Sequence, residues 1–325
     1  MRPIAHYLLT TPILLLLVLV TMAISAACGS DGCSTDVIYS PWLFELRLSR
    51  VSAAFATGGL LSLAGVLMQL LLRNPLAEPY VLGVSGGAAV GAMLGSLLMP
   101  ATLVVFGLQV GALAGAMLAT ILLFILARNS LTALPMLNAV SGVNLILTGV
   151  MIASGFGALI SLLLSLSPDT QLRGALFWLM GDLDVDTFGW SAWVVLLLAG
   201  AWSVASAPQL NILVHGEVTA HLLGLRVRRL RIMLLAVASL ATAAAVSLAG
   251  AIGFIGLVVP HAMRLVLGND QRLLLPATML AGGGALVLAD LLARTLVAPL
   301  QLPVGVVTSL VGVPVFLSML LRRQR

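Results

Sequence analysis

Apolar runs follow one another along almost the whole chain, and they constrain its fold more than any other feature. Of its 325 residues, 61% are hydrophobic and 8% are charged, and the mean hydropathy is +1.16. So little polar sequence cannot cover the surface of a water-soluble domain. A bilayer core needs about 20 apolar residues per helix, so this length has room for about eight to eleven spans. We therefore expect an all-α, polytopic integral membrane protein that forms one domain, residues 1–325.

Ten of the runs are predicted to span the membrane. They lie at about 8–27, 51–72, 81–98, 101–127, 140–166, 190–207, 232–249, 249–268, 273–293 and 304–321. The eighth is interrupted by Gly250, Gly253, Gly256 and Pro260, so we expect it to be short or discontinuous, as helices that line a water-filled path often are. Glycines recur every fourth residue at 83, 87, 91 and 95, and again at 107, 111 and 115. These ridges predict close helix packing.

The arginines sort strongly to one side of this ten-span topology. The chain has no lysine, so its formal charge of +5 comes from arginine. Ten spans place both termini on one side, together with the arginines at 2, 73, 128, 226, 228, 229, 231, 264, 272, 322, 323 and 325. Only Arg47, Arg50, Arg173 and Arg294 lie opposite. Because arginine is enriched in cytoplasmic loops, both termini are predicted to be cytoplasmic, in the inner membrane. Topology thus explains the basic charge without a nucleic-acid partner.

The segment His215–Arg231 is the longest interval in which polar and charged residues are frequent. Val218, Leu222 and Leu225 recur at i, i+4 and i+7, which predicts one face of a short helix that Gly224 helps to end. Four arginines follow at once. An amphipathic segment at the cytoplasmic surface favours docking of a partner. The alternative is an interfacial connector whose arginines only fix the topology.

The sequence lacks the motifs of an enzyme or an ATP-binding domain. A phosphate loop needs a lysine, and the four histidines are too dispersed for a metal cage, so we expect no cofactor and no metal. The only acid within the predicted spans is Asp290, four residues before Arg294, a spacing that permits an ion pair on one helix face. One acid gives little support to the alternative of an ion-coupled secondary transporter. A passage energised by another protein is the favoured interpretation.

Two cysteines, Cys28 and Cys33, follow the first apolar run. A disulfide between them is compatible with a loop outside the cytoplasm. A second interpretation is that residues 25–28 end a lipoprotein signal, which would make the chain a membrane anchor. The run at 8–27 is long for a signal core, so we favour a first transmembrane helix.

Seven segments resemble the permeases of ATP-binding-cassette (ABC) importers for iron–siderophore, haem and vitamin B12, the FecCD type. They are residues 47–50, 63–88, 145–150, 216–231, 250–265, 275–294 and 302–323, in the family's order. The resemblance implies a homodimer of ten-helix subunits around a central path, without an ATPase site of its own. It also implies two cytoplasmic ATP-binding subunits and a periplasmic substrate-binding protein as partners. The expected cargo is a large metal chelate, with iron–siderophore or haem favoured over cobalamin.

The resemblance also assigns contacts with these partners. The segment from Glu217 to Arg231 corresponds to the family's two coupling helices, which sit in a groove of the ATPase. We expect that contact to involve Glu217, Val218, His221, Leu222, Gly224 and Leu225. Arg47, Arg50 and Arg294 correspond to periplasmic arginines that meet acidic residues of the binding protein. For each of these, the alternative is a lipid phosphate or a pair within the chain, and Asp290 is the obvious partner for Arg294.

Two further assignments concern the path itself. Asn74 and Leu76 correspond to positions that narrow the path on the cytoplasmic side. The other half of this gate carries small hydroxyl residues in the vitamin B12 permease, where this chain has Gly142 and Val143. Arg173 follows the fifth span, and we hypothesise that it attracts an anionic chelate. The alternative for Arg173 is a surface pair with Asp169.

Overall fold

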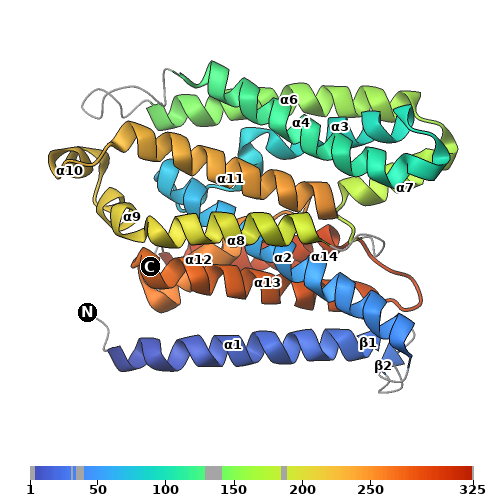
Figure 1. Ribbon diagram of the computed structural model, residues 1–325, viewed down its shortest axis with the longest axis horizontal. Coiled ribbons are helices and arrows are strands. Elements are labelled where there is room, and N and C mark those ends of the chain that lie inside the picture. Colours follow the sequence, from blue (N-terminus) through green and yellow to red (C-terminus); the bar gives the residue numbers. More distant parts are fainter. Residues whose placement is uncertain (1–3, 31, 34–39, 129–140, 184–188, 324–325) are drawn as a thin grey trace.

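Helices make up nearly all of the protein. The computed structural model describes residues 4–30, 32–33, 40–128, 141–183 and 189–323, and Figure 1 shows the helices lying side by side. The elements are α1 (Ile4–Ala27), β1 (Cys28–Gly29), β2 (Gly32–Cys33), α2 (Pro41–Leu71), η2 (Pro79–Leu82), α3 (Val84–Leu98), η3 (Ala101–Leu103), α4 (Val104–Leu126), α6 (Ser141–Leu166), α7 (Asp169–Leu179), α8 (Trp190–Ala205), α9 (Ala207–Val214), α10 (Glu217–Leu222), α11 (Val227–Ala249), α12 (Ile255–Leu267), α13 (Gln271–Thr295) and α14 (Val304–Arg323). The two short strands pair antiparallel.

The ten predicted spans all correspond to helices. Within the described residues, α2, α4, α6, α11 and α13 are each long and apolar enough to cross a membrane, and the bent pair α8–α9 makes a sixth. The helices α1, α3, α12 and α14 carry shorter apolar stretches. A helix that faces lipid can carry apolar side chains on its outer surface, and large apolar residues are indeed exposed along α1, α4, α6 and α14. The all-helical, multi-pass prediction is confirmed.

The second helix forms the centre of the packing. The most apolar window of α2 is 89% buried, and the helix packs against α11, α12 and α13. Gly58 lies against the carbonyl of Gly282, and Gly65 against that of Gly256, so a side chain at either position would overlap backbone. The helix begins ten residues before the predicted second span, and the predicted polar stretch around Arg47 is therefore helical.

The two glycine ridges meet each other, which confirms the close helix packing that they predicted and identifies the partner of each ridge. In the antiparallel pair α3 and α4, Gly91 lies against the carbonyl of Gly111, while Gly87 and Gly95 approach Gly115 and Gly107. Small residues of this kind let helix backbones touch in lipid, where packing rather than the hydrophobic effect holds helices together.

The eighth span contains only a short helix, one of the two forms predicted, and we call it the broken span because its first residues are not helical. The helix α11 ends at Ala249, α12 begins only at Ile255, and residues 250–254 between them are not helical. Gly250 and Phe254 both have left-handed backbones, with φ of 65° and 69°. A phenylalanine in that region is an outlier, so its surroundings must hold it there.

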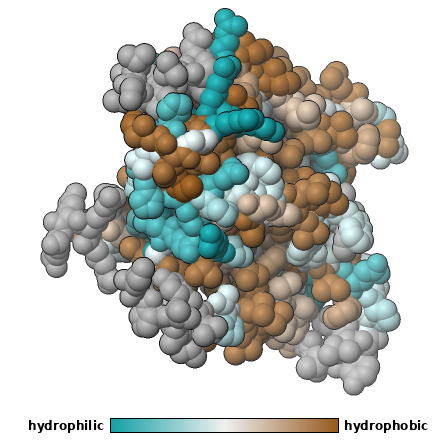
Figure 2. Space-filling model, turned by 60° about the vertical axis from the view of Figure 1, so that its left-hand side comes forward, coloured by the Kyte–Doolittle hydropathy of each residue, from teal (hydrophilic) through white to brown (hydrophobic). Residues whose placement is uncertain are grey.

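The long helices give the molecule two unlike ends (Figure 1). The N- and C-terminal ends of the chain lie at the same end as α9 and α10, which we call the α10 end. The β1–β2 hairpin and α7 lie at the opposite end, the hairpin end. Figure 2 turns the α10 end toward the viewer and shows hydrophilic surface gathered there between apolar regions.

Candidate functional site

A sharp bend brings the chain to α10. The helices α8 and α9 meet at 61°, next to Ser206, so the sixth span turns at its end instead of continuing straight. The side chain of Asn211 then fixes α9 to the start of α13, because its Nδ2 donates to Asp270 and its Oδ1 accepts from the N–H of Gln271, both at 2.8 Å. Gly216, with φ of 113°, makes the turn into α10.

The helix α10 has one face toward the protein and one toward solvent. Ala220 is fully buried and Glu217 is 9% exposed, whereas Leu222 is 75% and Leu223 64% exposed. Val218 and His221 are exposed as well. The helix is amphipathic, as predicted, but Val218 and Leu222 are exposed and the described chain does not cover them.

The end of α10 matches the expected role of its glycine. Gly224 has a left-handed backbone, φ 81°, and the N–H of Leu225 donates to the carbonyl of Ala220 at 3.0 Å. Leu225 is half-buried and, with Gly224, Arg226 and Arg229, lines a cavity of about 460 Å³ between α8–α9 and the start of α11. This hollow beside an exposed apolar helix is a shape suited to a protein partner.

The structure divides the predicted coupling segment differently from the sequence. Its only helix before α11 is the six-residue α10, and the second short helix at this end, α9, precedes the segment. Val227–Arg231 form the first turns of α11, because Val227 and Leu230 continue the buried face of that helix. Arg228 and Arg229 remain exposed, but Arg231 is only 2% exposed.

Glu217 faces the interior and joins two arginines. Its Oε1 lies 3.3 Å from Nη2 of Arg73, and its Oε2 lies 3.5 Å from Nη1 of Arg231. The Arg231 side chain is buried, whereas that of Arg73 is half-exposed at 52%. The family resemblance assigned Glu217 to contact with an ATPase, and this structure gives it contacts inside its own chain.

The predicted gate residues lie on two elements. Asn74 follows Arg73 at the end of α2, and its Oδ1 accepts the N–H of Leu76 at 2.9 Å, which closes a tight turn. Leu76 is 39% exposed. Gly142 and Val143 lie in the first turn of α6, and Val143 is 62% exposed. Their role as a gate stays a prediction.

The sequence did not indicate that the carboxylate of Glu78 contacts the broken span. Oε1 of Glu78 accepts the N–H of Phe254 at 2.8 Å, and Oη of Tyr80 accepts the N–H of Ile252 at 3.0 Å. Burial raises the pKa of the Glu78 carboxyl, and the hydrogen bond from Phe254 opposes that rise. Glu78 lies between spans two and three, 176 residues from its partner, and no local pattern links the two positions.

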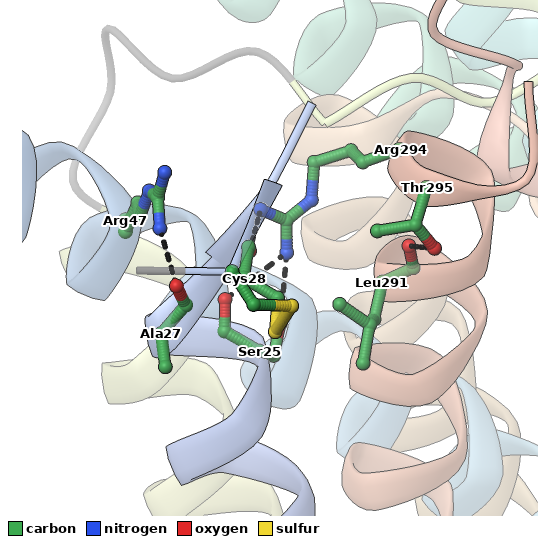
Figure 3. The surroundings of a disulfide bond; sticks show 8 residues. Ser25, Ala27, Cys28, Arg47, Leu291, Arg294 and Thr295 are labelled. Carbon is green, nitrogen blue, oxygen red and sulfur yellow. Dashed lines mark hydrogen bonds between the residues drawn. A yellow bond between two sulfur atoms is a disulfide. The ribbon is translucent and has the colours of Figure 1, made fainter. Parts of the chain in front are cut away.

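At the hairpin end, the two cysteines form a disulfide (Figure 3). Nη1 of Arg294 donates to the carbonyl of Cys28 at 3.1 Å, and its Nη2 donates to Oγ of Ser25 at 2.8 Å. Nη1 of Arg47 donates to the carbonyl of Ala27 at 2.7 Å. Two of the predicted docking arginines thus hold the end of α1 and its hairpin.

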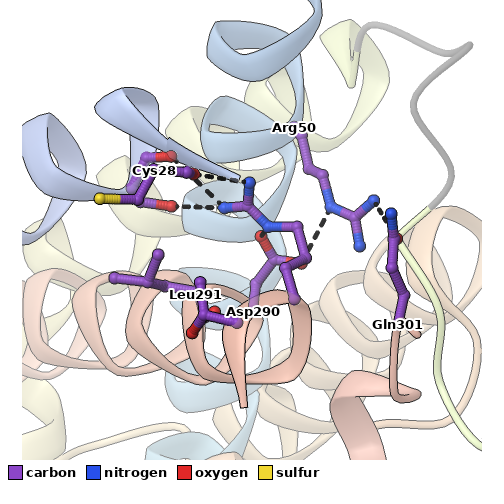
Figure 4. Close-up of polar contacts among 8 residues, drawn as sticks. Cys28, Arg50, Asp290, Leu291 and Gln301 are labelled. Carbon is purple, nitrogen blue, oxygen red and sulfur yellow. Dashed lines mark hydrogen bonds and ion pairs between the residues drawn. The ribbon is translucent and has the colours of Figure 1, made fainter. Parts of the chain in front are cut away.

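The carboxylate of Asp290 is buried between the side chains of Arg50 and Arg294 (Figure 4). Oδ1 of Asp290 accepts from Nε of Arg50 at 3.0 Å, and Oδ2 lies 3.0 Å from Nε of Arg294, an ion pair without a well-aligned hydrogen bond. Arg50 also donates to Gln301 at 3.3 Å. Asp290 is fully buried, and Arg50 and Arg294 are 8% and 4% exposed. The alternative pairing within the chain is therefore formed, and docking by Arg47, Arg50 and Arg294 stays a prediction.

Arg173 lies on α7 beside a larger cavity at the hairpin end. The cavity, about 710 Å³, is lined by residues of α3, α4, α7 and α11, among them Met93, Leu108 and Trp178. The Arg173 guanidinium lies 5.7 Å from the ring centroid of Phe177, a cation–π contact. In the described part of the chain no ion pair joins Arg173 to Asp169. An exposed cation beside an apolar hollow could contact an anionic, largely apolar ligand.

Comparison with known proteins identifies the family. The model of the FecCD transport family matches residues 8–322. The chain belongs to this family of ABC transporter permeases. The cobalamin import system permease protein BtuC of Halobacterium salinarum is 42% identical over 285 residues, 86% of this chain and 73% of that one. The hemin transport system permease protein HmuU of Yersinia pestis is 38% identical over 301 residues, 90% of this chain and 86% of that one.

A solved structure agrees with this assignment. An inward-facing ABC transporter, assigned to the metal-chelate type, matches with a TM-score of 0.81 and 30% identity, over 94% of this chain and 96% of that one. This FecCD permease is a transport subunit, and separate subunits hydrolyse ATP. The family resemblance drawn from the seven sequence segments is confirmed.

Proposed function

We propose that this FecCD permease moves a large metal chelate into the cytoplasm as the membrane-spanning subunit of a binding-protein-dependent ABC importer. The match to the inward-facing transporter, which extends over almost the full length of both chains, is the observation that carries the proposal. The cargo classes of the two relatives, cobalamin and hemin, are both large metal–macrocycle complexes.

An anionic cargo, iron–siderophore or haem, fits the hairpin end best. Arg173 supplies an exposed cation to the 710 Å³ cavity, whose remaining lining is largely apolar but includes one carboxylate, that of Asp182. Cobalamin is the second candidate, favoured by the relative from Halobacterium salinarum.

The two unlike ends of the molecule supply surfaces for the partners. Two cytoplasmic ATPase subunits dock at the α10 end, where Leu222 and Leu223 expose an apolar surface next to the 460 Å³ cavity. The periplasmic binding protein docks at the hairpin end, where Arg47 is the least buried of the three predicted arginines. Both termini are then cytoplasmic, in agreement with the arginine distribution.

A second copy of the chain completes the path. The apolar windows of α4 and α6 are only 22% and 17% buried, so a single chain leaves wide apolar faces for lipid and for its twin. Residues Asn74, Leu76, Gly142 and Val143 narrow the cytoplasmic end of the path, and Arg173 lies at its opposite mouth. Each ATPase subunit changes the position of α10 when ATP binds or leaves, and the permease follows between two states.

Reconstituted transport tests the proposal. The permease, its ATPase subunit and its binding protein are placed in vesicles, and uptake of haem, a ferric siderophore and cobalamin is measured in turn. We expect uptake of one chelate class that requires ATP and all three proteins. Uptake that follows a proton or sodium gradient without an ATPase would instead establish the ion-coupled alternative.

A further inference from the structure

We propose that Glu217 is a positioning residue inside the permease, which links the motion of α10 through Arg73 and Glu78 to the broken span before α12. The inference rests on the proposed function, because it takes α10 as the helix that an ATPase moves. It differs from the family-based assignment, in which Glu217 contacts the ATPase itself.

The direction of the Glu217 side chain is the first support. Glu217 begins α10, yet its side chain is 11% exposed, whereas Leu222 on the same helix is 75% exposed. Both carboxylate oxygens face arginines of this chain, Oε1 toward Arg73 at 3.3 Å and Oε2 toward Arg231 at 3.5 Å. A partner that covers the outer face of α10 would meet leucines there and leave this carboxylate where it is.

The place of Arg73 is the second support. It is the junction between α2 and the turn that carries Asn74 and Leu76, and its backbone is left-handed, with φ of 49°. A non-glycine residue adopts this conformation uncommonly, and here it ends the helix and turns the chain toward Asn74. The ion pair with Glu217 ties this junction to the coupling helix, so a displacement of α10 pulls directly on the end of α2.

The turn then connects Arg73 to the broken span. The N–H of Leu76 and the N–H of Ala77 donate to the side chain and the carbonyl of Asn74, at 2.9 and 3.0 Å, which makes the turn compact. Glu78 follows at once and accepts the N–H of Phe254 at 2.8 Å, next to the first residue of α12. A continuous set of contacts therefore runs from α10 to α12 through six residues, 73–78.

A static brace is the competing explanation, and it makes a different prediction. If these contacts only stabilise the fold, their loss lowers stability and leaves the stoichiometry of transport unchanged. If they transmit motion, their loss uncouples ATP hydrolysis from chelate movement while the complex stays assembled. Physical proximity alone does not distinguish the two, so energetic coupling between the residues must be measured.

The experiment uses the full importer in vesicles and compares Glu217→Gln, Arg73→Gln and the double variant. Three quantities are measured: ATPase subunit retained on purification, ATP hydrolysed, and chelate transported per ATP. We expect both single variants to retain the ATPase subunit and to transport about tenfold less chelate per ATP. The double variant should be no worse than Glu217→Gln alone, because Arg73→Gln removes a contact that Glu217→Gln has already removed, whereas Glu217→Gln also loses Arg231.

Conservative variants and controls separate this effect from misfolding. Arg73→Lys keeps a cation near Glu217, so it should transport more chelate per ATP than Arg73→Gln. Glu78→Gln keeps an acceptor for the N–H of Phe254, so it should transport more chelate per ATP than Glu78→Ala. Arg272→Gln, at an exposed arginine on the first turn of α13, should transport like the unchanged protein.

Three results would overturn the inference. The first is loss of the ATPase subunit from Glu217→Gln, which would make Glu217 a docking residue. The second is a double variant whose loss of transport per ATP equals the product of the two single losses, and the third is transport per ATP that is unaltered in both single variants. Leu222→Glu separates the proposed function from this inference, because docking on α10 predicts that this variant alone releases the ATPase subunit.

Discussion

At the scale of single residues, the five charged residues that are most buried in the described part of the chain all lie beside an opposite charge. Asp290 accepts from Arg50 and pairs with Arg294, and Glu217 pairs with Arg73 and Arg231. Such groups lose their hydration on folding, so removal of one partner leaves an uncompensated charge. Arg50 and Arg294 are expected from the family to dock the binding protein, but they also stabilise the fold through Asp290. A test of docking at these two residues must therefore measure the stability of each variant as well.

The first prediction concerns Asp290. Asp290→Asn leaves Arg50 and Arg294 without their shared anion, and we expect the free energy of unfolding to fall by about 3 kcal/mol, as for other broken buried pairs. Thermal unfolding of the purified permease in detergent measures this. Asp169→Asn, at an exposed residue in the first turn of α7, is the control and should change stability by less than about 0.5 kcal/mol. Equal effects of the two variants would contradict a structural role for the Asp290 pairings.

The second prediction concerns the disulfide. Cys33→Ser opens the hairpin that positions the Cys28 carbonyl for Arg294, and the loss of a short covalent loop costs about 2 kcal/mol in the chain-entropy model. Reducing agent should lower the unfolding temperature of the unchanged protein and leave that of Cys33→Ser unaltered. An unfolding temperature insensitive to reductant in both proteins would argue against a structural disulfide.

At the scale of elements, apolar run length and glycine spacing were sufficient to predict the helices and the close packing of two of them. The spacing did not say that the ridges of α3 and α4 meet each other, and two glycines of the eighth run lie in the non-helical residues 250–254. The bend between α8 and α9 was not predicted, because hydropathy reports the length of a run and not its direction. The hydrogen bond from the N–H of Phe254 to Glu78 was not predicted either, since it joins two non-helical segments far apart in sequence.

The third prediction tests the glycine contact. Gly91→Leu places a side chain in the space that the Gly111 carbonyl occupies, so α3 and α4 must separate. Overpacking of this kind costs about 1–3 kcal/mol or more, and we expect a lower yield of monodisperse protein. Gly155→Leu on α6 is the matched control, because a Cβ at that position has no neighbouring atom of this chain within 4 Å. Comparable yields from the two variants would show that the ridge contact is dispensable.

At the scale of the whole molecule, charge sorting and structure agree on two unlike ends. The described arginines predicted to be cytoplasmic include Arg226, Arg228 and Arg229 beside α10, while Arg47 and Arg50 lie at the hairpin end. The sequence predicted this sidedness because it depends on how many arginines each loop carries. It could not predict that Arg231 turns inward to Glu217, because that depends on where α11 begins.

The fourth prediction follows from this sidedness. In a permease expressed without its ATPase subunit, a cysteine introduced at Leu222 should react with a membrane-impermeant maleimide only after spheroplasts are opened, whereas one at Asp169 should react in intact spheroplasts. Both positions are exposed, so access depends on the side of the membrane. The reverse pattern would invert the topology and remove α10 from the reach of a cytoplasmic ATPase.

The central claim is that the apolar outer face of α10 binds the ATPase that drives this permease. The most direct measurement is the amount of its ATPase subunit that co-purifies with the permease and with Leu222→Glu. Leu300→Glu serves as the control, because Leu300 is 66% exposed in the turn between α13 and α14, away from α10. We predict at least about a tenfold loss for Leu222→Glu and none for Leu300→Glu, since a charge in a buried apolar contact costs more than about 1.4 kcal/mol. Undiminished co-purification with Leu222→Glu would contradict the account.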